Sequence, residues 1–314
     1  MQPVERRPPI QPMLVLAFGI LAVSFGSIFI RQAQDYAASL VIAAYRLTFA
    51  TLVITPIALT RNRGELASLK RNQLLLAALS GLLLALHFAT WTSSLEFTTV
   101  ASSVVLVSTT PLWVALFSPL FLKEPVTRPV VIGMTLALVG AVTIGLSDAC
   151  AGENGRLTCP AFTEFVQGKA FLGDLLALMG AIMGAGYVMI GRKLRPGISL
   201  MGYIFLVYGV AALGLVILML ASGESPVGYP SQAYLWFLLL AIFPQLLGHS
   251  SFNYALGYLS AAYVSITLLG EPICATILAY FLLNEIPTPV KIFGAILILA
   301  GIYIASRAEA QKTG

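Results

Sequence analysis

Charged side chains are scarce in this sequence of 314 residues, in which 18 Lys and Arg and 13 Asp and Glu amount to 10%. A soluble domain carries roughly 25% charged residues, and so few charges cannot cover a water-facing surface of this size. The apolar share is 58% and the mean hydropathy is +0.90. The composition therefore excludes a soluble fold, a disordered chain and a nucleic-acid binder, and it predicts an integral membrane protein.

Cysteine and histidine are also rare, with three and two residues. The sequence contains no His-Glu-x-x-His, no Gly-x-Ser-x-Gly and no Walker loop, the motifs typical of zinc hydrolases, serine hydrolases and nucleotide-driven pumps. We therefore expect neither an enzyme nor a cofactor nor a bound metal. An intramembrane enzyme or a receptor is the alternative from another class.

The sequence contains long uncharged runs. A membrane β-barrel would instead show segments of about 10 residues in which apolar and polar side chains alternate. Residues 72–95, 97–122, 196–223 and 225–270 contain no Asp, Glu, Lys or Arg. As one helix the last segment would be about 69 Å long, whereas the hydrocarbon core is about 30 Å thick. It must therefore hold two spans, with a turn near Leu256-Gly257-Tyr258.

The predicted fold class is an all-α integral membrane protein with ten transmembrane helices. Their approximate limits are 13–30, 39–59, 73–95, 97–122, 129–147, 171–191, 198–221, 233–254, 260–283 and 289–306.

The basic residues assign the two sides of the membrane. With an even number of spans both chain ends lie on one side. Placing them in the cytoplasm puts 13 of the 18 Lys and Arg on inner segments, 4 on outer segments and Arg46 inside a span. Basic residues favour the cytoplasmic side, so we expect cytoplasmic N- and C-termini and attribute the net charge of +5 to cytoplasmic loops.

The long outer connection, residues 148–170, contains Cys150 and Cys159. On this topology it faces an oxidising compartment, where the two thiols either form a disulfide or stay free. The sequence leaves both alternatives open.

Aligning Pro111 with Pro272 matches the two halves of the chain without a gap over the fourth and fifth helices of each, so that Glu124 meets Glu285. We call this register the repeat alignment. Because each unit has five spans, an odd number, its copy enters the membrane from the opposite side. We therefore predict two inverted repeats, residues 1–147 and 171–314, joined by the loop at 148–170. Inverted repeats are typical of alternating-access transporters.

The paired prolines, the two glycines seven residues apart in the fifth and tenth helices and the Leu-x-Glu that ends the fourth and ninth helices resemble the EamA domain. So do residues 91–101 and their counterpart 252–262. Over residues 13–306 the chain resembles bacterial members of the drug/metabolite transporter superfamily, and within it the amino-acid exporters of the YddG type. The resemblance implies a multi-pass protein of the bacterial inner membrane that exports small metabolites, with aromatic or other apolar amino acids as the leading candidates.

Pro111 and Pro272 interrupt two helices at corresponding positions, which in transporters indicates the substrate site. A proline leaves the carbonyl four residues before it without its donor. Those carbonyls, of Val107 and Leu268, are tolerated where they face protein or a wet cavity. The alternative is a kink that serves helix packing alone.

Four ionisable side chains, Arg46, His87, His249 and Glu271, lie inside predicted spans. Such residues normally face the bundle interior and mark functional sites, and helical spacing places further polar and aromatic groups on the same faces. The predicted substrate site consists of His87, Trp91, Ser94, Thr110, Pro111, Tyr187, Gln245, His249, Phe252, Tyr263, Thr267 and Glu271. The alternatives are buried histidines satisfied by a neighbour and aromatic stripes that only pack.

Aromatic walls with few polar groups suit an amphipathic solute such as an amino acid. They also suit a lipophilic or quaternary cation held by cation–π contacts and by Glu271. The sequence lacks the basic cluster that phosphorylated solutes require. We therefore expect a secondary transporter of amino acids that works by alternating access, with export as the direction that the resemblance implies and multidrug efflux as the alternative.

Glu271 and His87 are the candidates for proton coupling, and uncoupled exchange is left open. The expected partners are the small-molecule substrate and membrane lipid, without nucleic acid. A monomer is expected, with a dimer left open.

Overall fold

The computed structural model of the chain describes residues 8–98, 100–149, 151–153, 156–158, 169–271, 273–274, 277–278 and 288–313. Apart from one short hairpin, the regular elements in these ranges are helices. Cys150 and Cys159 lie outside the described residues, so their pairing stays a prediction.

The first half of the chain contains α1 (Pro12–Val23), α2 (Gly26–Gln34), α3 (Ser39–Arg61), α4 (Arg63–Ser68), α5 (Arg71–Phe97), α6 (Val100–Val107), α7 (Thr110–Phe121) and α8 (Arg128–Ala149). The hairpin β1 (Ala151–Glu153) and β2 (Arg156–Thr158) lies in the predicted outer loop.

The second half contains α10 (Lys169–Leu194), α11 (Leu200–Ala221), α12 (Ser231–Leu240), the π-helix η1 (Ala241–His249), α13 (Ser250–Ala255), α14 (Ala261–Thr267), the 3₁₀ turn η2 (Leu268–Gly270) and α16 (Pro289–Thr313). A turn at residues 256–258 separates α13 from α14, as the length of the uncharged segment predicted.

Two predicted helices have non-helical breaks, while the eighth and the ninth contain the π-helix η1 and the 3₁₀ turn η2. The first divides at Ser24 and Phe25 into α1 and α2, and the fourth divides at Ser108 and Thr109 into α6 and α7. Pro111 explains the second break, because it has no N–H to donate to the carbonyl of Val107. That carbonyl instead accepts a hydrogen bond from the hydroxyl of Thr110 at 2.8 Å.

By length and composition, six helical segments in the described part of the chain could each cross a membrane. They are Pro12–Gln34, Ser39–Arg61, Arg71–Phe97, Phe171–Leu194, Leu200–Ala221 and Ser231–Ala255. Shorter apolar helices cover Thr110–Phe121, Arg128–Thr143, Ala261–Gly270 and Ile292–Ala305. Each lies within or close to a predicted range, and the number of ten spans stays a prediction.

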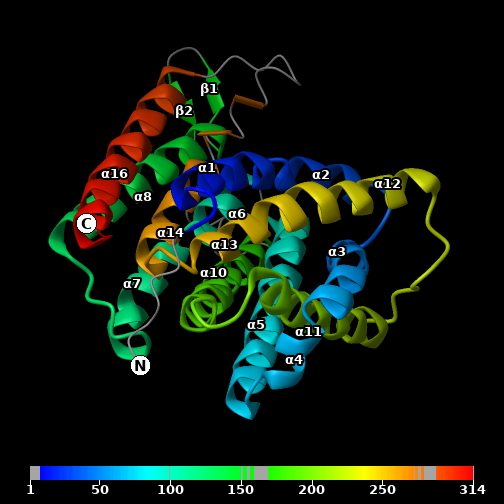
Figure 1. The fold of residues 1–314 in the computed structure, drawn as a ribbon. Helices are drawn as coiled ribbons and strands as arrows, with labels where there is room; N and C mark the ends of the chain where they lie inside the picture. Colours follow the sequence, from blue (N-terminus) through cyan, green and yellow to red (C-terminus); the bar gives the residue numbers. More distant parts are fainter. Residues whose placement is uncertain are drawn as a thin grey trace.

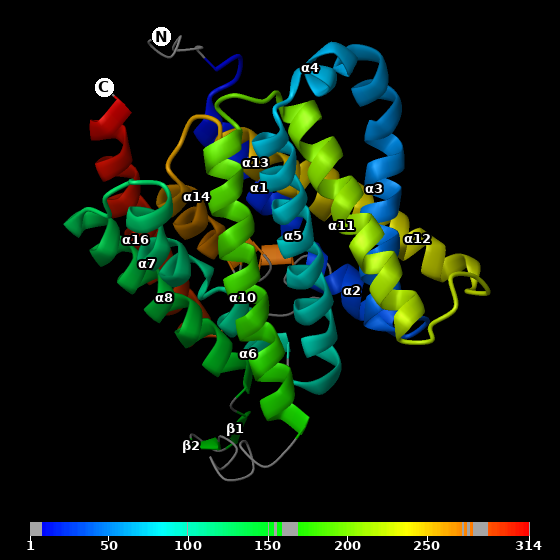
Figure 2. The ribbon, with the colours of Figure 1, turned by 90° about the horizontal axis from the view of Figure 1, so that it is seen from below.

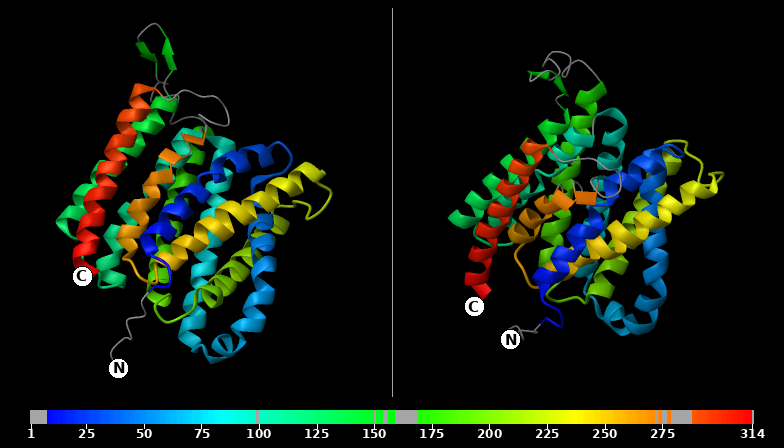
Figure 3. Two further views of the ribbon diagram at one scale, coloured as in Figure 1. Left: turned by 45° about the horizontal axis from the view of Figure 1, so that its top comes forward. Right: turned by 90° about the horizontal axis from the view of Figure 1, so that it is seen from above.

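Helices of the two halves pack against one another in an exchanged pattern. The first helix of the second half, α10, runs along α5 of the first half, while α1 packs on η1 and α13 of the second half (Figures 1 and 2). The last helices of the halves, α8 and α16, lie side by side. The start of α1 and the end of α16 lie at one end of the bundle, and the hairpin lies at the other (Figure 3).

One contact inside each half recurs at equivalent residues. Arg31 donates from Nη1 to the carbonyl of Leu95 at 3.4 Å, and Arg192 donates from Nη1 to the carbonyl of Leu256 at 3.2 Å. The repeat alignment pairs Arg31 with Arg192 and Leu95 with Leu256. Arg192 also forms an ion pair with Glu124, 2.6 Å from Nε to Oε1.

Glycines bring α8 and α16 into close contact. A methyl group on Gly133 would lie 2.5 Å from the carbonyl oxygen of Gly301, and one on Gly140 would lie 2.5 Å from that of Gly294. In the repeat alignment Gly133 is equivalent to Gly294, and Gly140 to Gly301. Gly133 therefore contacts the equivalent of Gly140, and Gly140 contacts the equivalent of Gly133. A two-fold axis produces this reciprocal pattern of contacts.

Enlarging a glycine of this contact is expected to push the two helices apart. Gly301→Leu should lower the free energy of unfolding by roughly 1–3 kcal/mol, since overpacking forces a backbone shift. Thermal unfolding in detergent measures the change. Gly64→Ala is the control, because nothing lies within 4 Å of a methyl group added there. Equal melting temperatures for the Gly301 variant and the wild type would contradict the close contact.

Candidate functional site

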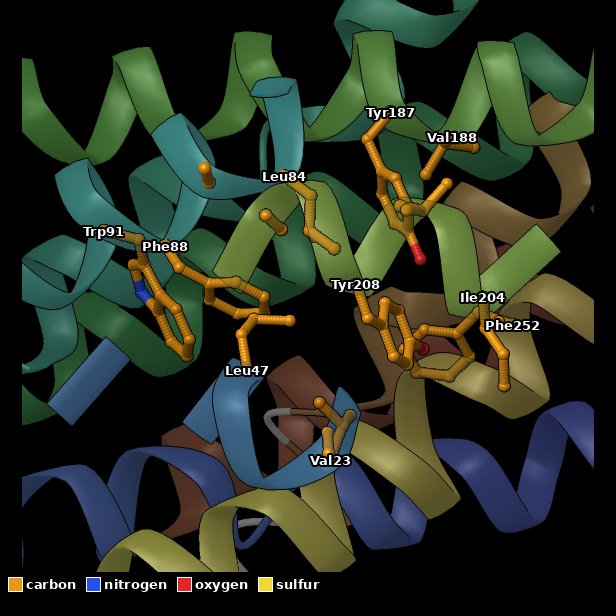
Figure 4. Close-up of a cluster of buried hydrophobic side chains, with 14 of the residues drawn as sticks. Val23, Leu47, Leu84, Phe88, Trp91, Tyr187, Val188, Ile204, Tyr208 and Phe252 are labelled. Atoms are coloured by element: carbon orange, nitrogen blue, oxygen red, sulfur yellow. The ribbon is translucent and has the colours of Figure 1, made fainter. Parts of the chain in front are cut away.

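A cavity lies between the two halves of the bundle. Its wall consists of Val23, His87, Trp91, Val107, Ser108, Thr110, Pro111, Gly184, Tyr187, Val188, His249, Phe252, Ser265, Leu268, Leu269 and Glu271. Figure 4 shows five aromatic side chains that converge on this interior region from α5, α10, α11 and α13: Phe88, Trp91, Tyr187, Tyr208 and Phe252.

The wall is built from equivalent positions of both halves. The lining pairs in the repeat alignment are Val23 with Gly184, Trp91 with Phe252, Val107 with Leu268, Ser108 with Leu269 and Thr110 with Glu271. Phe88 and His249 are also equivalent, and their ring centroids are 5.2 Å apart. A position that contacts its own equivalent lies at the symmetry axis, so the cavity lies where the halves meet.

The interrupted helices contribute to the wall as their prolines predicted. Val107, at the end of α6, and Leu268, at the start of η2, both line the cavity. Pro111 lines it as well, whereas Pro272 lies outside the described residues. Backbone that leaves the regular α-helix is thus found beside the cavity in both halves, and the carbonyls of Val107 and Leu268 are satisfied by the Thr110 hydroxyl and the Glu271 N–H.

A missing side chain makes room for the ring of His87. A methyl group on Gly184 would lie 3.0 Å from Nδ1 of His87. The equivalent contact in the other half is reversed, because a methyl group on Gly248 would lie 3.1 Å from Cβ of Val23. The first half therefore contributes the larger side chain to both contacts, Val23 on its first helix and His87 on its third, and the second half contributes the two glycines.

The hydrogen bond of His87 fixes the tautomer of its neutral ring. Its Nδ1 lies 2.8 Å from the carbonyl oxygen of Gly180. Because a carbonyl oxygen only accepts, Nδ1 carries the hydrogen and Nε2 of the neutral ring is an acceptor. His87 also stacks on Trp91, with ring centroids 6.0 Å apart. The ring can thus offer a solute an acceptor beside an aromatic face.

Tyr187 is held at the cavity wall by a buried polar network. Asn253 donates from Nδ2 to the hydroxyl oxygen of Tyr187 at 2.6 Å and to that of Tyr208 at 3.3 Å. The Tyr208 hydroxyl lies 3.2 Å from that of Ser250. The network fixes the position of the Tyr187 ring at the cavity wall.

Glu271 brings the one carboxylate to the cavity wall. Its backbone carbonyl accepts a hydrogen bond from Ser24 at 3.3 Å. Within the described part of the chain the only ion pair joins Arg192 and Glu124, and no hydrogen bond to the Glu271 carboxylate is found there. A carboxylate in this position is free to bind a cationic group.

Arg46 lies behind the cavity wall, and only 2% of its surface is exposed. Nε donates to Oε1 of Gln245 at 2.9 Å, and the guanidinium carbon lies 4.0 Å from the ring centroid of Phe88. Nη1 and Nη2 are buried and have no hydrogen-bond partner among the described residues.

Eight of the twelve predicted site residues line the cavity: His87, Trp91, Thr110, Pro111, Tyr187, His249, Phe252 and Glu271. The other four, Ser94, Gln245, Tyr263 and Thr267, lie elsewhere. Ser94 donates to the carbonyl of Trp91 and contacts Ser103, and Thr267 donates to the carbonyl of Tyr263.

Gln245 binds Arg46 behind the wall. The prediction did not include Asn253 and Tyr208, which support the wall from behind, and their helical spacing gave no signal for this role.

Comparison with known proteins identifies the family. The model of the EamA-like transporter family matches residues 11–146 and 171–307. The chain belongs to the EamA-like transporter family. This finding confirms the resemblance seen in the sequence, and it means that the apolar helices cross a membrane several times.

The relatives of this EamA-like transporter are themselves named as transporters. An uncharacterized transporter of Archaeoglobus fulgidus is 26% identical over 308 residues, which cover 95% of this chain and 98% of the relative. A probable terminal-alkyne amino-acid exporter of Streptantibioticus cattleyicolor is 28% identical over 211 residues, which cover 65% of this chain and 63% of the relative.

A solved structure, described only as the crystal structure of a protein, has a TM-score of 0.74 at 17% sequence identity. The match covers 96% of this chain and 99% of that structure's chain. At this identity it shows that the fold of this EamA-like transporter occurs among solved structures.

Filling the space at Gly184 is expected to displace His87 and to slow transport. Gly184→Val places on the first helix of the second half the side chain that Val23 has in the first half. Overpacking of this kind costs roughly 1–3 kcal/mol. Solute flux in proteoliposomes and the melting temperature measure the effect. Gly209→Val is the matched control, because a methyl group there meets only Thr51 at 3.9 Å. Wild-type flux with Gly184→Val would show that the position of the His87 ring is not required.

Proposed function

We propose that this EamA-like transporter exports small amphipathic metabolites, foremost amino acids with aromatic or other apolar side chains. The observation that carries the proposal is the pairing of aromatic rings with an unpartnered carboxylate, Glu271, in one buried cavity. An ammonium group satisfies such a carboxylate, and Trp91 and Phe252 offer flat apolar surfaces to a side chain.

The proposed mechanism is alternating access. The proposal places ten spans in the bacterial inner membrane, both chain ends in the cytoplasm and the two halves in inverted orientation. The exchanged contacts between the halves support this arrangement, because a two-fold axis makes two symmetry-related openings similar in packing energy. A solute between Trp91 and Phe252 would be reached from one side or the other as the halves rock.

A second candidate function is efflux of lipophilic or quaternary cations. The same carboxylate and the same aromatic rings favour it, since a cation over an aromatic face gains about 0.5–2 kcal/mol. The relative from Streptantibioticus cattleyicolor, named a probable terminal-alkyne amino-acid exporter, favours export of amino acids. The two functions differ in whether a carboxylate on the solute is needed.

Efflux of radiolabelled L-phenylalanine from proteoliposomes tests the proposal. Trp91→Ala is expected to lower the flux about tenfold, the equivalent of about 1.4 kcal/mol that an aromatic contact can supply. Trp113→Ala is the matched control, because Trp113 packs on Phe117, with its ring nitrogen bonded to Thr109. If quaternary amines move and amino acids neither move nor compete, export of amino acids is wrong and cation efflux is right.

Proton coupling is tested in the same vesicles with an imposed pH gradient. If Glu271 carries the proton, the gradient accelerates wild-type flux and has no effect on Glu271→Gln, which cannot ionise. Flux at equal pH on both sides serves as the control for binding. A wild type that ignores the gradient is an uncoupled exchanger, and Glu271 then serves only to bind the solute.

A further inference from the structure

The guanidinium of Arg46 is a poorly satisfied charge in the described bundle interior. It has one hydrogen bond, from Nε to Gln245, while Nη1 and Nη2 are buried without a partner in the part of the chain that the structure describes. Taking such a charge out of water costs several kcal/mol unless an opposite charge or further acceptors compensate. The aromatic face of Phe88 offsets only a part of this cost.

The side chains around Arg46 offer further donors where an acceptor is needed. Nε2 of Gln245, which can only donate, is buried and has no partner among the described residues. Nδ1 of His249 is buried and unpartnered in the same way, and in one tautomer it is a donor too. Oε1 of Gln245, the one acceptor atom of its side chain, already accepts a hydrogen bond from Nε of Arg46. The cluster therefore presents a set of N–H groups directed at no acceptor in the described structure.

The cluster lies one layer of side chains behind the cavity. Phe88 covers the guanidinium, and its ring centroid is 5.2 Å from that of His249 and 6.4 Å from that of Trp91. His249 and Trp91 both line the cavity. A solute that displaces the ring of Phe88 or His249 from this position would reach Arg46 directly.

We infer that Arg46 and Gln245 form a subsite for the carboxylate of the transported solute. A carboxylate has two oxygens that match the paired N–H groups of a guanidinium, and Gln245 supplies a third donor. This inference rests on the proposed function and makes it more specific. With Glu271 at the cavity wall for the ammonium group, the site recognises both ends of an α-amino acid.

The subsite explains why a carboxylate at the cavity wall and a guanidinium behind it do not form an ion pair with each other. The ion pair between Arg192 and Glu124 is the only one within the described residues, so no nitrogen of Arg46 bonds the Glu271 carboxylate. A solute with both charges bridges the gap between them, whereas a simple cation leaves Arg46 unpaired and adds a repulsion.

Binding of three probes to the purified full-length protein tests the subsite. L-phenylalanine has both charged groups, L-phenylalanine amide lacks the carboxylate, and 3-phenylpropionate lacks the ammonium group. The wild type is expected to bind phenylalanine between tenfold and a hundredfold more tightly than the amide, since a charged hydrogen bond contributes about 1.5–3 kcal/mol. Arg46→Gln should abolish this preference without weakening the binding of the amide, because the variant also removes the repulsion.

Two further variants keep the outcome clear if Arg46→Gln does not fold. Arg46→Lys keeps the charge and should retain a reduced preference for phenylalanine over the amide. Gln245→Leu should weaken binding of phenylalanine and 3-phenylpropionate but not of the amide. Arg31→Gln is the control for loss of an arginine elsewhere, because Arg31 bonds only a backbone carbonyl within the described part of the chain.

Equal affinity of the wild type for phenylalanine and its amide would overturn the subsite, as would an Arg46→Lys variant that weakens both ligands alike. If the carboxylate that Arg46 binds is that of Glu271 and not that of the solute, Glu271→Gln and Arg46→Gln will have the same effect on all three probes. The inference is then wrong. If 3-phenylpropionate binds in an Arg46-dependent way but phenylalanine is not transported, the subsite stands and the proposed function fails.

Discussion

A hydrocarbon layer offers no hydrogen bonds, and this property decides where the polar side chains of the chain lie. Most Lys and Arg are outside the long apolar helices, where water solvates them. The few polar groups inside turn toward the interior, as Arg46, Gln245 and His249 do. Because the interior contains so few of these groups, each one that lacks a partner there indicates what the bundle is built to receive.

The exchanged packing of the halves places those groups at one point. Phe88 and His249, equivalent in the two halves, touch across the axis. Around them the repeats have diverged: Gly184 of the second half faces His87 of the first, whereas Gly248 of the second half faces Val23 of the first. A symmetric framework, suited to opening on two sides, thus encloses an asymmetric wall, and that asymmetry lets the two ends of a solute be recognised differently.

The sequence predicted those features that have a local cause. Pro111 predicted the break between α6 and α7, and helical spacing placed His87 and Trp91 on one cavity face. The same spacing failed for Tyr263 and Thr267, because α14 passes into the tighter turn η2 before Glu271 and so changes the face that each residue presents. The contact of Arg46 with Gln245 has no local cause at all. Only the packing of α3 against η1 reveals it, since neither residue has a counterpart of its own kind in the repeat alignment.

An experimental structure with bound L-phenylalanine tests the central claim, a solute site at the axis between the halves, most directly. We expect the aromatic side chain of the ligand to lie between Trp91 and Phe252, its ammonium group at Glu271 and its carboxylate toward Arg46. Ligand density outside this cavity, or contacts to one half alone, would contradict it.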